Sequence, residues 1–132
     1  IPERKHDRYF LLATLFPLAD PSQDRNLGAS LRRIRDSRNG AALDRRVAAL
    51  LDADAGQLRF RLRQMIRLID SRRGGVNWEQ LLIDLLRWDW ADRRVQRAWA
   101  MDYYSEIAAS DKPDDGKKEE GTEEPSILVD ER

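Results

Sequence analysis

Arginine is the residue type whose spacing in this sequence could do chemistry. Arginines stand in pairs at 32–33 and 45–46, and three more follow at intervals of four: Arg59, Arg63 and Arg67. On a helical wheel these side chains fall outside the apolar stripes of their helices, so we expect them to face solvent. Like charges four residues apart cost about 0.2–0.5 kcal/mol per pair. We therefore expect an anionic partner, either a phosphate chain or acidic side chains on neighbouring helices.

The charge of the chain is divided along its length. Residues 1–100 contain 20 basic side chains against 13 acidic ones, and residues 101–132 contain 4 against 11, although the formal net charge is zero. An arginine-rich folded part is the electrostatic footprint of a protein that binds phosphates. A genome whose codons favour arginine would produce the same excess, so composition alone leaves both explanations open.

Other reactive residue types are scarce. The sequence has no cysteine, which excludes disulfides, thiolate catalysis and cysteine-bound zinc. The one histidine, His6, stands in a charged stretch without a plausible partner, and helix ends explain Asp52 and Asp54 better than a bound cation does. Neither a glycine-rich phosphate loop nor a nucleophile motif is found. We expect no catalytic activity, no metal and no other cofactor.

The elements that must position the arginines have helical apolar spacing. Six segments repeat apolar residues every three or four positions. Their stripes are Leu12, Leu15 and Phe16, with Leu11 beside them; Leu27, Leu31 and Ile34; Leu43, Val47, Leu50 and Leu51; Leu58, Leu62, Met65, Ile66 and Ile69; Leu81, Leu85 and Trp88; and Val95, Trp99, Tyr103 and Ile107. No alternating strand pattern of useful length interrupts them. We predict an all-α fold, a compact bundle of about six short helices.

Punctuating residues set the expected helix ends. Pro17 stops the first segment, Asn39-Gly40 the second, Asp52 the third and the stretch 71–75 the fourth, while the sixth starts near Ala91. Two pairs with capping-box spacing, Asp54 with Gln57 and Asn77 with Gln80, predict the starts of the fourth and fifth helices.

The composition changes after about residue 110. Residues 111–132 are rich in Asp, Glu, Lys, Gly and Pro and carry few apolar side chains before Ile127–Val129, too few to offset the entropy of ordering the backbone. We predict a helical domain over 1–110 and an acidic tail over 111–132 that is disordered or loosely docked. No apolar stretch is long enough to span a membrane and no signal peptide is found, so we expect a cytoplasmic protein without a membrane partner.

The aromatic side chains divide into two groups. Trp78 and Trp99 continue the apolar faces of their helices and are predicted to be buried. Phe60 lies opposite the stripe of the fourth helix, and Trp90 stands between helices, so both are candidates for contact with a partner.

Several runs of residues, in order between about residue 8 and residue 104, form a specific pattern. They are Asn26–Ile34, Leu43–Asp54, Leu62–Gln64, Val76–Leu82, Leu85–Asp89 and Arg93–Ala100. The set resembles the small subunit of the type I-E CRISPR Cascade complex, the CasB family. It departs from some members at Ala29 and Ala55, where they carry a basic residue.

This resemblance implies an all-helical, non-catalytic subunit, present in two copies beside the other Cascade subunits. Its arginines would hold the backbones of the guide RNA and the displaced single-stranded DNA, while base pairing reads the sequence. The resemblance carries nucleic-acid contacts to Arg32, Arg33, Arg45, Arg46 and Arg63, and the helical wheel adds Arg35, Arg59 and Arg67. We expect these side chains to gather on one shared outer face.

Two other classes of function compete with this interpretation. The helices on either side of Gly74-Gly75 form a compact pair, as in a helix-turn-helix regulator. However, the second of them opens with Asn77, Trp78 and Glu79 and carries Asp84, which is acidic or apolar where a major groove requires donors. A scaffold whose arginine face meets acidic proteins is the other alternative, and composition does not exclude it.

Overall fold

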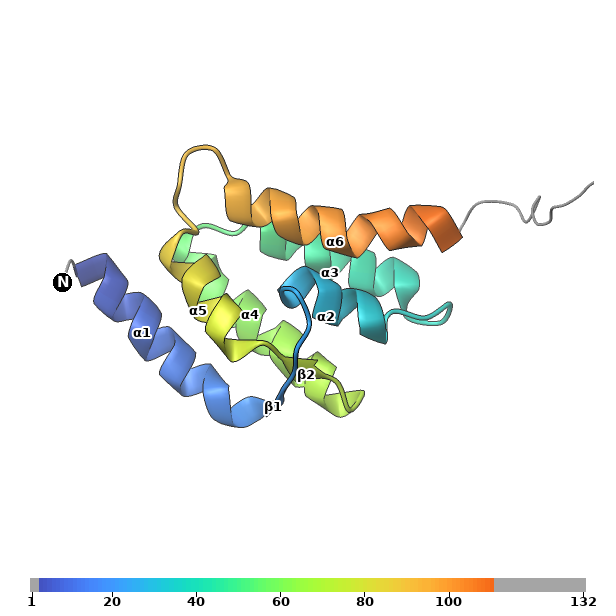
Figure 1. Cartoon of the computed structure of the whole chain (residues 1–132), viewed down its shortest axis with the longest axis horizontal. Helices are drawn as coiled ribbons and strands as arrows, with labels where there is room; N and C mark the ends of the chain where they lie inside the picture. Colours follow the sequence, from blue (N-terminus) through green and yellow to red (C-terminus); the bar gives the residue numbers. More distant parts are fainter. Residues whose placement is uncertain (1–2, 111–132) are drawn as a thin grey trace, which may run out of the picture.

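The computed structural model describes residues 3–110, with side chains over residues 5–105, and six α-helices make up most of this part (Figure 1). They are α1 (Glu3–Leu15), α2 (Leu27–Ile34), α3 (Gly40–Leu51), α4 (Ala55–Ser71), α5 (Trp78–Leu86) and α6 (Arg94–Ser110). The predicted all-α bundle is confirmed. The predicted tail over 111–132 lies outside the described residues, and Ile107 lies outside the described side chains. None of the helices within the described part has the length and apolar character of a membrane span.

The end of the second helix differs from the prediction. We expected Asn39-Gly40 to end it, but α2 ends at Ile34 and α3 begins at Gly40. Arg35 has an extended backbone, and the Asp36 carboxylate accepts hydrogen bonds from the backbone N–H groups of Arg38 (2.9 Å) and Asn39 (2.8 Å). An aspartate that bonds the backbone ahead of it in this way competes with continuation of a helix.

The first helix ends at Leu15, and this changes the position of Phe16. Leu15 is buried as predicted, and Leu11, which we expected beside the shared face, is buried as well, whereas Leu12 is half-buried. The prediction that Phe16 lies on this face is wrong, because its side chain is exposed. Residues Phe16–Leu18 form a 3-10 turn, η1, around Pro17, which takes Phe16 out of the α-helical progression. The Phe16 ring packs edge-on against Trp78, with the ring centroids 5.4 Å apart.

Two very short strands join distant segments. Strand β1 (Asp20–Pro21) pairs in parallel with β2 (Gly75–Val76), and the Ser22 N–H extends the pairing to the Val76 carbonyl at 2.9 Å. Strands of two residues leave no alternation for a sequence pattern to reveal. They fasten the segment before α2 to the turn that follows α4.

The core is formed where α2 packs along α6, while α6 also contacts α3 and α2 also contacts α4 (Figure 1). Leu31, Leu62 and Trp99 are almost fully buried, and Trp78 is buried as predicted. Helices α2 and α6 approach so closely that a Cβ added at Gly28 would lie 2.2 Å from the Trp99 carbonyl oxygen. Trp90 and Phe60 are exposed, as the sequence predicted.

Candidate nucleic-acid interface

Arg45 and Arg46 lie on the outer side of α3. Leu43, Val47 and Leu50 form the buried face of this helix, and both arginine side chains are exposed. Among the described residues, no carboxylate pairs with either guanidinium. These two cations are therefore available to an anion from outside the fold, as the wheel predicted.

The row on α4 is also exposed. Leu58, Leu62, Met65, Ile66 and Ile69 face the core, and the side chains of Arg59, Arg63 and Arg67 lie outside this stripe. No acidic side chain in the described part of the chain forms an ion pair with any of the three. The like-charge repulsion along this row thus remains uncompensated within that part of the fold.

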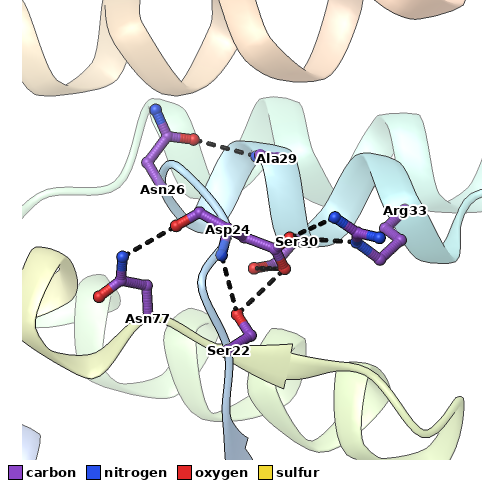
Figure 2. Close-up of polar contacts among 7 residues, drawn as sticks. All are labelled: Ser22, Asp24, Asn26, Ala29, Ser30, Arg33 and Asn77. Carbon is purple, nitrogen blue, oxygen red and sulfur yellow. Dashed lines mark hydrogen bonds and ion pairs between the residues drawn. The ribbon is translucent and has the colours of Figure 1, made fainter.

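Arg33 on α2 is held by a buried carboxylate (Figure 2). Its Nη2 and Nε donate to Asp24 Oδ1 at 2.6 and 3.1 Å, while Oδ2 of Asp24 accepts from the hydroxyls of Ser30 (2.9 Å) and Ser22 (3.1 Å). Burial alone would raise the pKa of Asp24, but the hydrogen bonds from Ser30, Arg33 and Ser22 outweigh it and lower the pKa. Because the Arg33 side chain is still 71% exposed, this contact orients the guanidinium without covering it.

Arg32 and Arg33 line a cavity of about 460 Å³ between α2 and α6. Ala29, Met101, Asp102 and Ser105 form the rest of its wall together with Arg25. Arg25 was not among the predicted arginines, because it precedes α2 and a helical wheel does not cover it. Its Nη1 lies 3.4 Å from Asp102 Oδ1, and its side chain remains well exposed. The cavity thus has three arginines around it.

Arg35 has an internal partner. Its Nε and Nη2 bond the two oxygens of Asp44 at 2.9 and 3.0 Å, and the Tyr103 hydroxyl donates to the same carboxylate at 2.6 Å. The hydrogen bond from Arg35 lowers the pKa of Asp44, and burial together with Asp44 raises the pKa of Tyr103. The Arg35 side chain is only 21% exposed, so the structure uses it to join α2, α3 and α6 instead of presenting it outward.

The eight predicted arginines do not line one common cavity. Arg32 and Arg33 meet at the α2–α6 cavity, whereas Arg59 and Arg63 line a second cavity between α4 and α1. The two cavities share no lining residue among the described part of the chain. The structure therefore provides separate cationic positions on α2, α3 and α4.

An arginine–tryptophan group between α5 and α6 was not assigned to a site from the sequence, although Trp90 was singled out. The guanidinium carbons of Arg87 and Arg94 each lie 5.1 Å from the centroid of the Trp90 ring, which is 44% exposed. The spacing of three and four residues around Trp90 is the signal that could have revealed it. No cluster of His, Cys, Asp and Glu suited to a metal ion occurs within the described residues.

The carboxylates set aside as helix ends act as such. Asp54 is the N-cap of α4, and its Oδ1 accepts from the Gln57 N–H at 2.9 Å in a complete capping box. Asp52 is the C-terminal residue flanking α3. His6 is exposed.

Comparison with known proteins gives a consistent result. The family model "CRISPR-associated protein Cse2" matches residues 1–104. The CRISPR-associated protein Cse2 of Thermus thermophilus is 36% identical over 111 residues, which cover 83% of this chain and 63% of that protein. The chain thus spans less than two thirds of the length of this curated relative.

Two crystal structures are similar to the fold. CasB from Thermus thermophilus matches with a TM-score of 0.70 and 36% identity, over 80% of this chain and 65% of that one. CasB from M. ruber matches with a TM-score of 0.75 and 33% identity, over 83% of this chain and 68% of that one. Both the sequence and the arrangement of helices are therefore similar to those of Cse2 (CasB) proteins.

Proposed function

The chain belongs to the Cse2 (CasB) family of CRISPR-associated proteins, and we propose that it is a non-catalytic small subunit of a Cascade surveillance complex that acts in the cytoplasm. In this proposal it holds the sugar-phosphate backbones of the guide RNA and the displaced DNA strand. Its protein partners are the other Cascade subunits, including a second copy of itself.

The observation that carries this proposal is the set of exposed arginines without a carboxylate partner in the described part of the chain. Arg45 and Arg46 on α3, and the row of three on α4, have no such partner. Arginine forks bind phosphate oxygens in two places, and each phosphate neutralised releases counterions. Phosphate contacts of this kind stabilise a bound strand without reading its sequence, because the bases do not take part in the contact.

Titration of the full chain against single-stranded and duplex oligonucleotides, by fluorescence anisotropy at several salt concentrations, tests the proposal. We expect weak binding that is independent of sequence, with a logarithmic salt slope of about −0.7 per phosphate contacted on single strands. The double variant R45Q/R46Q should weaken binding equally for unrelated sequences. If both arginines contact phosphates, it should also make the slope shallower by about 1.4.

The matched control is R72Q, compared with the single variant R45Q, because it removes the same charge from an exposed arginine that is already paired. Arg72 pairs with Asp36 at 2.9 Å. R72Q should change the slope much less than R45Q. Equal effects of these two single variants would contradict a role for particular arginines and leave only a dependence on total charge.

The same titration distinguishes the alternative functions. Tight binding to one duplex sequence would favour a regulator, although Trp78, Leu81 and Asp84 of α5 are buried, so much of that helix could not enter a groove. No binding at low salt would favour a scaffold that meets acidic proteins.

A further inference from the structure

The cavity between α1 and α4 combines two kinds of side chain that a nucleotide requires. It has a volume of about 420 Å³, within the range of small-ligand sites. Its wall consists of Asp7, Arg8, Phe10, Leu11, Thr14, Ala55, Arg59 and Arg63. The predicted arginines thus share this wall with an aromatic ring.

Phe10 is exposed although it lies on a fixed element. Its side chain is 70% exposed, the highest fraction among the large apolar side chains of the described residues. The neighbouring Leu11 and the later Leu15 are buried and hold α1 against the core. The Phe10 ring is therefore presented at the cavity by a packed helix, and no other part of the described fold covers it.

The charge of the cavity is positive. Arg59 and Arg63 are exposed and have no carboxylate partner within residues 5–105. Arg8 is buried and bonds Asp89 at 2.9 Å, so it belongs to the packing of the fold. Asp7 is the one carboxylate on the described wall, against two available guanidinium groups.

We propose that this cavity binds one unpaired nucleotide of a single strand, with the base stacked on Phe10 and the adjoining phosphates held by Arg59 and Arg63. The proposal rests on the proposed function and adds to it a stacking site. Stacking on an aromatic ring is tolerant of sequence because every base has a π-face. An acidic peptide would satisfy the two arginines but would leave the ring without a role.

The hydroxyl of Thr14, the one hydroxyl on the described wall, already donates to the Leu11 carbonyl at 2.7 Å, so it cannot also donate to a 2′-hydroxyl. Stacking on Phe10 and phosphate contacts to Arg59 and Arg63 are open to DNA and RNA alike. We therefore expect oligo(dT) and oligo(rU) both to enter. If replacement of Phe10 by alanine lowers the affinity for either oligonucleotide, the result supports the site. The oligonucleotide whose affinity falls more identifies the type of strand that occupies it.

The test compares F10A with F60A in the full chain, using anisotropy of labelled oligo(dT) and oligo(rU). Phe60 is the matched control because it lies on α4, is 66% exposed and is not part of the wall. F10A should weaken binding by about 5- to 150-fold, the effect of losing one stacked base, and F10W should retain it. The salt slope of F10A should stay that of the wild type because the ring carries no charge, whereas R59Q/R63Q should make it shallower by about 1.4.

Two outcomes would overturn the stacking site without affecting the proposed function: F10A binding like F60A while the wild type binds strands, or F10A changing the salt slope. If the wild type binds no strand at all, both proposals fail. Photo-crosslinking of bromouridine-containing strands gives an independent readout. An adduct on the peptide containing Phe10 is expected, and adducts confined to other peptides would contradict the site.

Discussion

Replacement of Gly28 by alanine should force α2 away from α6. A Cβ at this position would lie 2.2 Å from the Trp99 carbonyl oxygen and 2.8 Å from its carbonyl carbon and Cα. These are backbone atoms, so no side-chain rotation relieves the clash. The two helices must separate by about 1 Å or more before the new methyl group reaches van der Waals distance. That movement would loosen the packing around Leu31 and Trp99, which are almost fully buried.

The expected loss of stability follows from two opposing effects. Overpacking of a well-packed contact costs about 1–3 kcal/mol, and we take the upper end because a whole helix pair must move. Alanine in a helix is favoured over glycine by up to about 1 kcal/mol. The free energy of unfolding of G28A should therefore fall by about 2 kcal/mol. The same movement would widen the cavity lined by Arg25, Arg32 and Arg33.

Gly56 supplies a matched control. It is the second residue of α4, as Gly28 is of α2, and it is exposed, with Asp54 Oδ1 at 3.4 Å as the nearest atom to an added Cβ. G56A should be unchanged or more stable by up to about 1 kcal/mol. Urea unfolding followed by far-UV circular dichroism measures both variants. If G28A unfolds at the wild-type midpoint or above it while G56A behaves as expected, the close packing of α2 on α6 is refuted.

Two further predictions concern pH and have opposite signs. Burial raises the pKa of Asp84, which accepts a hydrogen bond from Trp99 Nε1 at 2.8 Å. Its contribution to stability is therefore present below the ordinary pKa of 3.8 and is lost as pH rises through the folded pKa. In urea unfolding, the free energy of unfolding of D84N should increase relative to that of the wild type as pH rises from about 4 towards neutral, and a difference that does not change with pH would contradict this. The hydrogen bond from Arg35 lowers the pKa of Asp44, so that contribution is present above 3.8 and is lost as pH falls through the folded pKa. D44N should lose about 1–3 kcal/mol at neutral pH, with the loss shrinking in acid, and an undiminished loss at low pH would show that ionisation of Asp44 is not involved.

The helices, and the starts of α4 and α5, could be predicted because their signals are local. The sixth helix, expected from near Ala91, begins at Arg94. The Asn77 side chain accepts from the Gln80 N–H at 3.1 Å, as its spacing predicted, and Asp54 caps α4 in the same way. Each cap needs residues only three apart, and each apolar stripe needs only its own helix. Such patterns are set by the chain itself, so tertiary contacts had little opportunity to override them.

The partners of the arginines could not be predicted in this way. A helical wheel shows which side chains lie outside the apolar face of their own helix, but it does not show which side chains of other helices contact them. Arg35 bonds Asp44, nine positions later, and the same carboxylate accepts from Tyr103, which is 59 positions away from it. Arg35 also follows the end of α2, where the wheel no longer applies. Its internal role depends on how α2, α3 and α6 meet.

This division of the arginines would allow a chain with zero formal net charge to attract an anion, as the proposed function requires. Within the described residues six arginines pair with aspartates, Arg35 and Arg72 among them. The fields of two opposite charges in contact largely cancel at distances beyond their separation, and salt screens what remains over a Debye length of about 8–10 Å. Arg45 and Arg46 have no such pairing in that part of the chain, so their fields are not cancelled locally. A phosphate chain would therefore respond to the positions of the unpaired arginines, and the net charge would predict little about its affinity.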